Sequence, residues 1–231
     1  MKQGDPMVLE YNPIKLGNRS IKVRNWKVKD RELYKSKIKN ISSTEDELKV
    51  RYECFVTNIL EKPTALNNDE LEYLFLLLRI ANLGDDLNYH WWCRNCEKTT
   101  DSKIKLSKLF TTKSGKIQDI DVGDIKIELQ DVQNVELYNN KLRTSDSPST
   151  DDLIFHIKSI NGDNTKGFQD IKNYFDELDI NTMDKISEAF EKMIFKIESR
   201  EHTVTCTHCG ANSTFNFDEI PDIIPPKWLK R

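Results

Sequence analysis

Four of the five cysteines fall into two Cys-x-x-Cys pairs, with 109 residues between Cys96 and Cys206. A two-residue gap lets both thiolates of a tight turn point at one metal ion, and tetrahedral zinc needs two such turns facing each other at Zn–S distances of about 2.3 Å. The spacing therefore predicts one structural zinc ion held by four thiolates, those of Cys93, Cys96, Cys206 and Cys209.

Other uses of these cysteines remain open but fit less well. Two disulfides would need an oxidising compartment, whereas the N-terminus lacks the apolar run of a secretory signal. A redox-active pair usually opens a helix, which neither of these pairs is expected to do. Two separate metal sites are a further alternative, with His90 joining the first pair and His202 or His208 the second. Cys54 has no cysteine neighbour and is expected to be a small buried residue of a helix.

Four thiolates fill a zinc coordination sphere and leave no position for an activated water. The sequence also contains no Gly-rich phosphate loop, no His-Glu-x-x-His pair and no Gly-x-Ser-x-Gly elbow. We therefore expect no enzymatic activity and no small-molecule substrate. No stretch approaches the roughly 20 apolar residues of a membrane-spanning helix, so we expect a chain that stays in a reducing cytoplasm.

The flanks of the two pairs resemble each other and predict how the cysteines are positioned. Short apolar or β-branched runs lead into each pair, and alternating runs around residues 104–106 and 215–217 lead out. Each half reads as strand, knuckle, strand. The predicted fold class is α+β: a helical layer with a split four-cysteine zinc ribbon, whose two knuckles are separated by a helical insertion.

Before the first pair the sequence predicts one strand and two helices. Residues 20–28 alternate as a strand with a register slip at Asn25. A capping box from Thr44 predicts a helix that ends before Pro63. Asn67 and Glu70 repeat the capping pattern ahead of residues 71–83, which are apolar on nearly every side and predict the central core helix.

Beyond the first pair, residues 103–106 and 124–129 alternate as strands and residues 144–150 read as a loop. Amphipathic helices are predicted over residues 168–178 and 186–197. The chain is thus divided into four segments. Residues 1–65 contain a strand and helix with a basic segment, and residues 66–147 contain the core helix, the first knuckle and a β segment. Residues 148–200 form a helical insertion, and residues 201–231 contain the second knuckle and an extended tail.

Charge is unevenly distributed. The formal net charge is −3, yet residues 14–39 carry ten Lys or Arg against two acidic residues, which leaves the rest of the chain strongly acidic. Such polarity suits either a contact face or a solvated ribbon. The candidate partner-binding residues are basic or aromatic near the N-terminus and apolar in the tail: Lys22, Arg24, Trp26, Lys27, Ile223, Ile224, Trp228 and Leu229.

Three stretches carry a resemblance to a known family. They are residues 21–32 (IKVRNWKVKDRE), residues 71–84 (LEYLFLLLRIANLG) running into CRNC at 93–96 and IKLSKL at 104–109, and CTHC at 206–209 followed by FNF at 215–217. In these stretches the chain resembles the baseplate hub and hub assembly proteins of T4-type contractile-tailed bacteriophages. The resemblance implies a non-enzymatic role in building the hub, with other baseplate proteins as partners, in the host cytoplasm during assembly and in the virion if the protein is retained there.

A zinc-ribbon protein that binds nucleic acid is the alternative. It would use the basic segment, including Arg31, for phosphate contacts that weaken steeply with salt. The acidic remainder of the chain and the lack of basic residues interleaved with aromatics around the knuckles argue against it.

Overall fold

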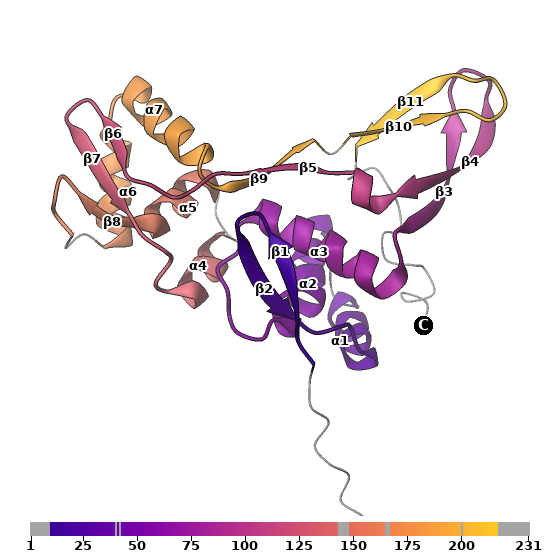
Figure 1. The fold of residues 1–231 in the computed structure, drawn as a ribbon, viewed down its shortest axis with the longest axis horizontal. Helices are drawn as coiled ribbons and strands as arrows, with labels where there is room; N and C mark the ends of the chain where they lie inside the picture. Colours follow the sequence, from indigo (N-terminus) through magenta and orange to yellow (C-terminus); the bar gives the residue numbers. More distant parts are fainter. Residues whose placement is uncertain are drawn as a thin grey trace, which may run out of the picture.

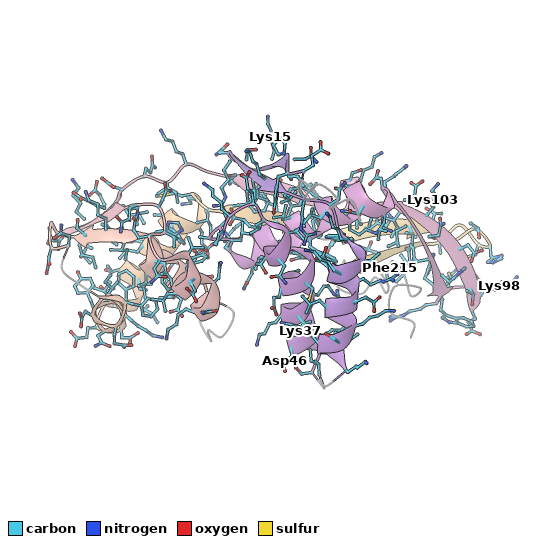
Figure 2. All side chains as sticks on the ribbon, turned by 90° about the horizontal axis from the view of Figure 1, so that it is seen from below. Lys15, Lys37, Asp46, Lys98, Lys103 and Phe215 are labelled. Atoms are coloured by element: carbon cyan, nitrogen blue, oxygen red, sulfur yellow. The ribbon has the colours of Figure 1, made fainter. Side chains whose placement is uncertain are left out.

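The computed structural model describes residues 10–39, 41, 43–142, 148–164, 167–199 and 201–216 (Figure 1). Its N-terminal region starts with an antiparallel hairpin and continues with three helices. These elements are β1 (Asn12–Leu16), β2 (Arg19–Val23), α1 (Val28–Ile38), α2 (Thr44–Phe55) and α3 (Asn68–Leu83). Figure 2 shows α1 and α2 projecting from the middle of the elongated molecule, with Lys37 and Asp46 near the end of the projection.

Two further hairpins form one end of the molecule (Figure 1). One consists of β3 (Asp86–Cys93) and β4 (Lys98–Lys105), and the other of β10 (Glu201–Thr205) and β11 (Asn212–Asn216). Both are antiparallel, and each is a separate two-stranded sheet. They come from distant parts of the described chain, so their proximity is a product of tertiary folding.

The opposite end of the molecule contains a three-stranded antiparallel sheet and four helices (Figure 1). The sheet has the order β6–β7–β8, and its second and third strands pair although α4 and α5 separate them in sequence. Their bounds are β6 (Ile120–Val122), β7 (Ile125–Leu129), β8 (Ile157–Ile160), α4 (Val135–Leu142), α5 (Pro148–His156), α6 (Phe168–Asp176) and α7 (Ile180–Glu191).

A long two-stranded ribbon joins the two ends. It pairs β5 (Thr111–Ser114) with β9 (Phe195–Ser199) and runs past α3 (Figure 1). The start of α3 holds it, because the amide of Asn67 donates to the Phe195 carbonyl at 3.2 Å. Gly115 follows β5 at a close approach, since a Cβ there would lie 2.1 Å from the backbone oxygen of Lys192.

Helix α3 confirms the predicted core helix. The Asn67 side chain accepts from the Glu70 backbone N–H, and the Glu70 carboxylate accepts from that of Asn67, both at 2.9 Å. The helix ends at Gly84, whose φ of 91° favours glycine. Between these ends its apolar side chains are buried in the main core: Leu71, Leu74, Phe75, Leu76 and Leu78.

Other expectations need correction. The strand predicted over residues 20–28 ends at Val23, and Val28 begins α1. The cap of α2 is Ser43 and not Thr44, because the Ser43 hydroxyl accepts from the Asp46 backbone N–H. Short 3₁₀ turns occur at Thr57–Ile59 and Leu106–Lys108.

The segment predicted as a helical insertion also differs from expectation. Residues 148–150 form the first turn of α5, whereas 143–147 lie outside the described residues. The predicted 186–197 helix ends at Glu191, and Ile197 belongs to β9. A second apolar cluster includes Ile120 and Ile127 from before the predicted boundary. The insertion is therefore a mixed α/β unit with its own core.

The architecture is mixed α and β, with small sheets. In the part of the chain that the structure describes, no helix has the length and apolar character needed to cross a bilayer.

Candidate metal centre

The two cysteine pairs lie in turns of the same geometry. In the first turn the backbone N–H of Glu97 donates to the Cys93 carbonyl at 2.8 Å, and in the second that of Gly210 donates to the Cys206 carbonyl at 2.9 Å. The donor residue has a positive φ in both turns, 55° at Glu97 and 75° at Gly210. The likeness expected from the flanking sequences is thus present in the backbone of both turns.

Aromatic packing brings the two hairpins together. Phe215 of β11 meets the ring of Trp91 edge to face at 5.4 Å between centroids and that of Tyr89 at 6.3 Å. Alternation along β3 buries Tyr89, Trp91 and Cys93 on one face, whereas Trp92 points outward and is 59% exposed. The strand pattern that buries the aromatics therefore also points Cys93 at the second hairpin.

The four sulfur atoms form one cluster. Cys93 Sγ lies 3.7 Å from Cys209 Sγ, Cys96 Sγ lies 3.7 Å from Cys206 Sγ, and all four lie within 4.8 Å of one another. A tetrahedral ion with Zn–S bonds of about 2.3 Å holds its sulfurs about 3.8 Å apart. A disulfide needs an S–S distance of about 2.05 Å. The spacing fits four ligands of one metal ion and does not fit bridges.

Polar side chains of the first hairpin contact the sulfur atoms of the second. The Thr100 hydroxyl lies 3.2 Å from Cys206 Sγ, and the Asn95 amide donates to Cys209 Sγ at 3.4 Å. The Thr100 contact lowers the pKa of Cys206 to about 5, and the Asn95 contact lowers that of Cys209. Desolvation raises the pKa of Cys96 to about 12. Thiolates are the metal-binding form, and these contacts favour the thiolate at Cys206 and Cys209.

The imidazole rings near the turns are not part of the sulfur cluster. Among the described residues, the cluster of ligand atoms holds the four cysteine sulfurs and no imidazole nitrogen. His90 pairs with Asp101, and His208 Nε2 lies 3.1 Å from the Thr99 carbonyl. Desolvation lowers the pKa of His202. The cluster joins both cysteine pairs, which is the arrangement of one shared site. Cys54 is fully buried in α2, as expected.

The N-terminal contact residues fall into two groups. Arg24 and Trp26 are buried, which corrects the expectation that they form part of a contact surface. Arg24 donates to Asp30 through both Nη atoms at 2.7 Å, and Trp26 Nε1 donates to the Phe55 carbonyl. Lys22 is exposed, and Lys27 is partly exposed. The four tail residues, Ile223, Ile224, Trp228 and Leu229, lie outside the described residues.

Sequence reasoning did not single out Asn95 and Thr100 as neighbours of the sulfurs. Asn95 stands inside the first pair, which is a signal that it lies beside a ligand. Thr100 has no such signal, because its contact to Cys206 exists only after the hairpins meet.

The fold and this cluster define a class of protein, one in which hairpins from distant parts of the chain meet at four cysteines able to hold one metal ion. The family model described as T4 bacteriophage base plate protein matches residues 8–224, and the chain belongs to that family. No curated protein matched, and no solved structure matched. The family implies a component of the virion tail with phage proteins as its neighbours.

Proposed function

We propose that this protein is a non-enzymatic structural or assembly component of the baseplate hub in a contractile-tailed phage, and that one structural zinc ion stabilises its protein-binding surfaces. Family membership supports the baseplate role, and the three stretches that resemble hub proteins support the hub. The observation that carries the zinc assignment is the sulfur tetrad, with its 3.7 Å separations.

Four thiolates select a soft or borderline cation, and a closed tetrahedral sulfur site is the usual structural zinc site. With four protein ligands the ion has no open position, so it supplies cross-linking and not Lewis-acid chemistry. Cys93 and Cys96 would hold it from the first hairpin, and Cys206 and Cys209 from the second. The two hairpins would then act as a split zinc ribbon.

The cross-link fixes the chain at both sides of the 109-residue segment between Cys96 and Cys206. Closing so long a loop is unfavourable for a flexible chain, and a bound ion offsets that cost. The hairpin end and the β5–β9 ribbon would then keep one arrangement relative to α3. A component that contacts several neighbours in an assembly needs such fixed surfaces.

The test is mass spectrometry of purified virions and of baseplate assembly intermediates from phage-infected host cells. We expect the protein in the intermediates if it acts only during assembly in the host cytoplasm, and in both samples if it stays in the tail. Absence from both would remove the baseplate role, whatever the metal content of the isolated protein.

A further inference from the structure

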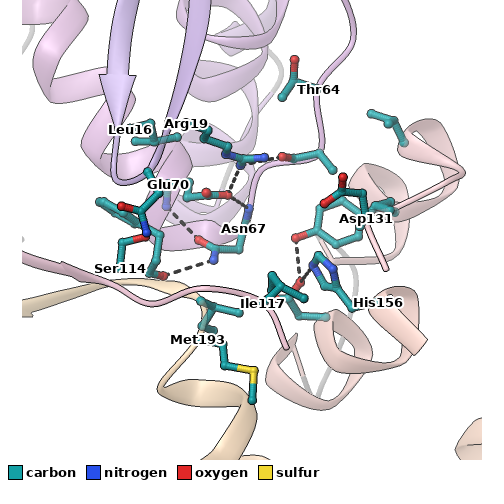
Figure 3. A pocket seen from close by; sticks show the side chains of 18 of the residues that line it. Leu16, Arg19, Thr64, Asn67, Glu70, Ser114, Ile117, Asp131, His156 and Met193 are labelled. Atoms are coloured by element: carbon teal, nitrogen blue, oxygen red, sulfur yellow. Dashed lines mark hydrogen bonds and ion pairs between the residues drawn. The ribbon is translucent and has the colours of Figure 1, made fainter. Parts of the chain in front are cut away.

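A cavity of about 640 Å³ lies between the two apolar clusters, beside the β5–β9 ribbon. Figure 3 shows Arg19, Asn67 and Glu70 on one wall and His156 on the other. Its volume lies within the roughly 300–1,000 Å³ of ligand pockets. The metal cluster does not line it, so the cavity is a separate feature of the molecule.

The first wall contributes a buried carboxylate. Glu70 is 7% exposed, and its Oε2 accepts from the Asn67 backbone N–H at 2.9 Å and pairs with Arg19 at 2.5 Å. None of the described residues donates a hydrogen bond to Oε1. One carboxylate oxygen thus holds the helix cap, and the other is available to the cavity.

The second wall contributes another. Asp152 of α5 is 4% exposed, and its Oδ1 accepts from the Tyr138 hydroxyl at 2.8 Å and lies 3.6 Å from His156 Nε2. Within the described part of the chain, Oδ2 has no hydrogen-bond donor. Each wall therefore has, on a buried residue, one carboxylate oxygen for which no donor is found among the described residues, and such oxygens favour a ligand that donates hydrogen bonds.

The electrostatics point the same way. Burial raises the pKa of Glu70, Arg19 lowers it less than burial raises it, and the negative charge of Asp152 raises it further. At Glu70, Arg19 therefore compensates only part of the cost of burying the charge. A cation between the two walls would stabilise both carboxylates.

The remaining lining suits a long side chain. Leu16, Val135 and Phe195 provide apolar surface along which an aliphatic stem can pack. Lys62 and Lys116 also line the cavity and are exposed, and no ion pair is found for either among the described residues. These two lysines would repel a ligand segment that carries many basic residues. They would attract a segment in which acidic residues stand beside a single cationic side chain.

We propose that this cavity receives one arginine or lysine side chain of another baseplate protein, with its charged end between Glu70 and Asp152 and acidic neighbours beside Lys62 and Lys116. The identity of the partner rests on the proposed baseplate function. Binding of the cationic side chain does not rest on that function. Neither the binding nor the identity of the partner depends on the metal.

The probe is a blocked pentapeptide with a central arginine between alanines and a glutamate at each end, titrated into the full chain by calorimetry. The comparison peptide carries citrulline, which keeps the shape and removes the charge. Hydrogen bonds to charged groups contribute about 1.5–3 kcal/mol, so we expect the citrulline peptide to bind about 10–100-fold more weakly.

The protein variants are Glu70→Gln and Asp152→Asn. Glutamine also serves at the third position of a capping box, so the first variant keeps the start of α3 while removing the charge. Each should weaken the arginine peptide about tenfold, whereas Asp131→Asn at an exposed lining position should change affinity less than about twofold. Unchanged metal content and thermal midpoint show that a variant is folded.

Equal binding of both peptides, or no binding of the arginine peptide at concentrations on the order of 1 mM, would overturn the proposal. Agmatine binding as tightly as the arginine peptide would overturn the protein-partner part and assign the cavity to a free small cation. Failure of these titrations leaves the virion test unaffected, so the two conclusions can fail separately.

Discussion

Asp30 joins α1 to the strand before it, and we predict that replacing it with alanine strongly destabilises the N-terminal region. Its carboxylate accepts from both Nη atoms of Arg24 at 2.7 Å and from the Lys27 backbone N–H at 2.8 Å. Arg24 is 4% exposed, and its other acceptors are the carbonyls of Asn25 and Asn58. Without Asp30 the guanidinium stays buried and loses its counter-charge.

The magnitude follows from two losses. Removing one partner of a buried ion pair costs about 3–5 kcal/mol, and losing the contact at the helix start adds about 1 kcal/mol. For a chain of this length, 1 kcal/mol shifts the midpoint by roughly 2–4 °C, so Tm should fall by about 10–20 °C. Circular dichroism or calorimetry measures the shift.

Two controls separate the ion pair from general damage to α1. Glu32→Ala removes a half-exposed acid that pairs with Arg31 at the surface, and it should change stability by less than about 1 kcal/mol. Arg24→Met with Asp30→Leu removes both charges and should recover much of the loss. Asp30→Ala no more destabilising than Glu32→Ala would refute the reasoning.

The same pair predicts a pH dependence. Burial alone would raise the pKa of Asp30, but the bonds from Arg24 and from the Lys27 backbone outweigh it and lower that pKa. A lowered folded-state pKa means that the contribution is complete above the unfolded value of about 3.9 and is lost as pH falls through the folded value. The stability gap between wild type and Asp30→Asn should therefore be constant near neutral pH and close below about pH 4.

Two further predictions concern the metal centre. Cys206→Ser should remove a ligand and with it part of a metal-binding free energy of about 10–16 kcal/mol. It should therefore lower metal content and Tm far more than the control Thr207→Ala on the exposed side of the same turn. Equal effects of the two variants in thermal melts and metal analysis would contradict this prediction. Gly210→Ala should lower the free energy of unfolding by about 1 kcal/mol because φ at Gly210 is 75°, whereas Glu97→Gly, at a φ of 55°, should be nearly neutral. Equal losses of unfolding free energy in denaturant titrations of the two variants would contradict this prediction.

The features that could be predicted from the sequence are those fixed by local or strongly constrained chemistry. The capping box of Asn67 and Glu70 lies within four residues, so its pattern is visible without tertiary information. The cysteine cluster spans the chain, yet its two-residue spacings and tetrahedral requirement left few alternatives. The likeness of the flanks further predicted a strand on each side of both turns.

The features that could not be predicted depend on long-range contacts. Residues 20–28 alternate apolar and charged side chains, but Arg24 is buried because Asp30, in the first turn of α1, neutralises it. Helix α1 was missed because it has no wide apolar stripe: its buried residues are Asp30 and Tyr34. Ile197 fits a helical repeat, and only pairing with β5 makes it a strand residue. The cavity between the two clusters exists only after both have folded.

X-ray absorption at the zinc edge on reduced full-length protein tests the central claim most directly, with elemental analysis of the same sample. We predict one zinc per chain, surrounded by four sulfur atoms at about 2.3 Å and no nitrogen or oxygen ligand. Protein that contains no zinc when freshly purified under reducing conditions, or a spectrum that requires fewer than four sulfurs, would contradict the account.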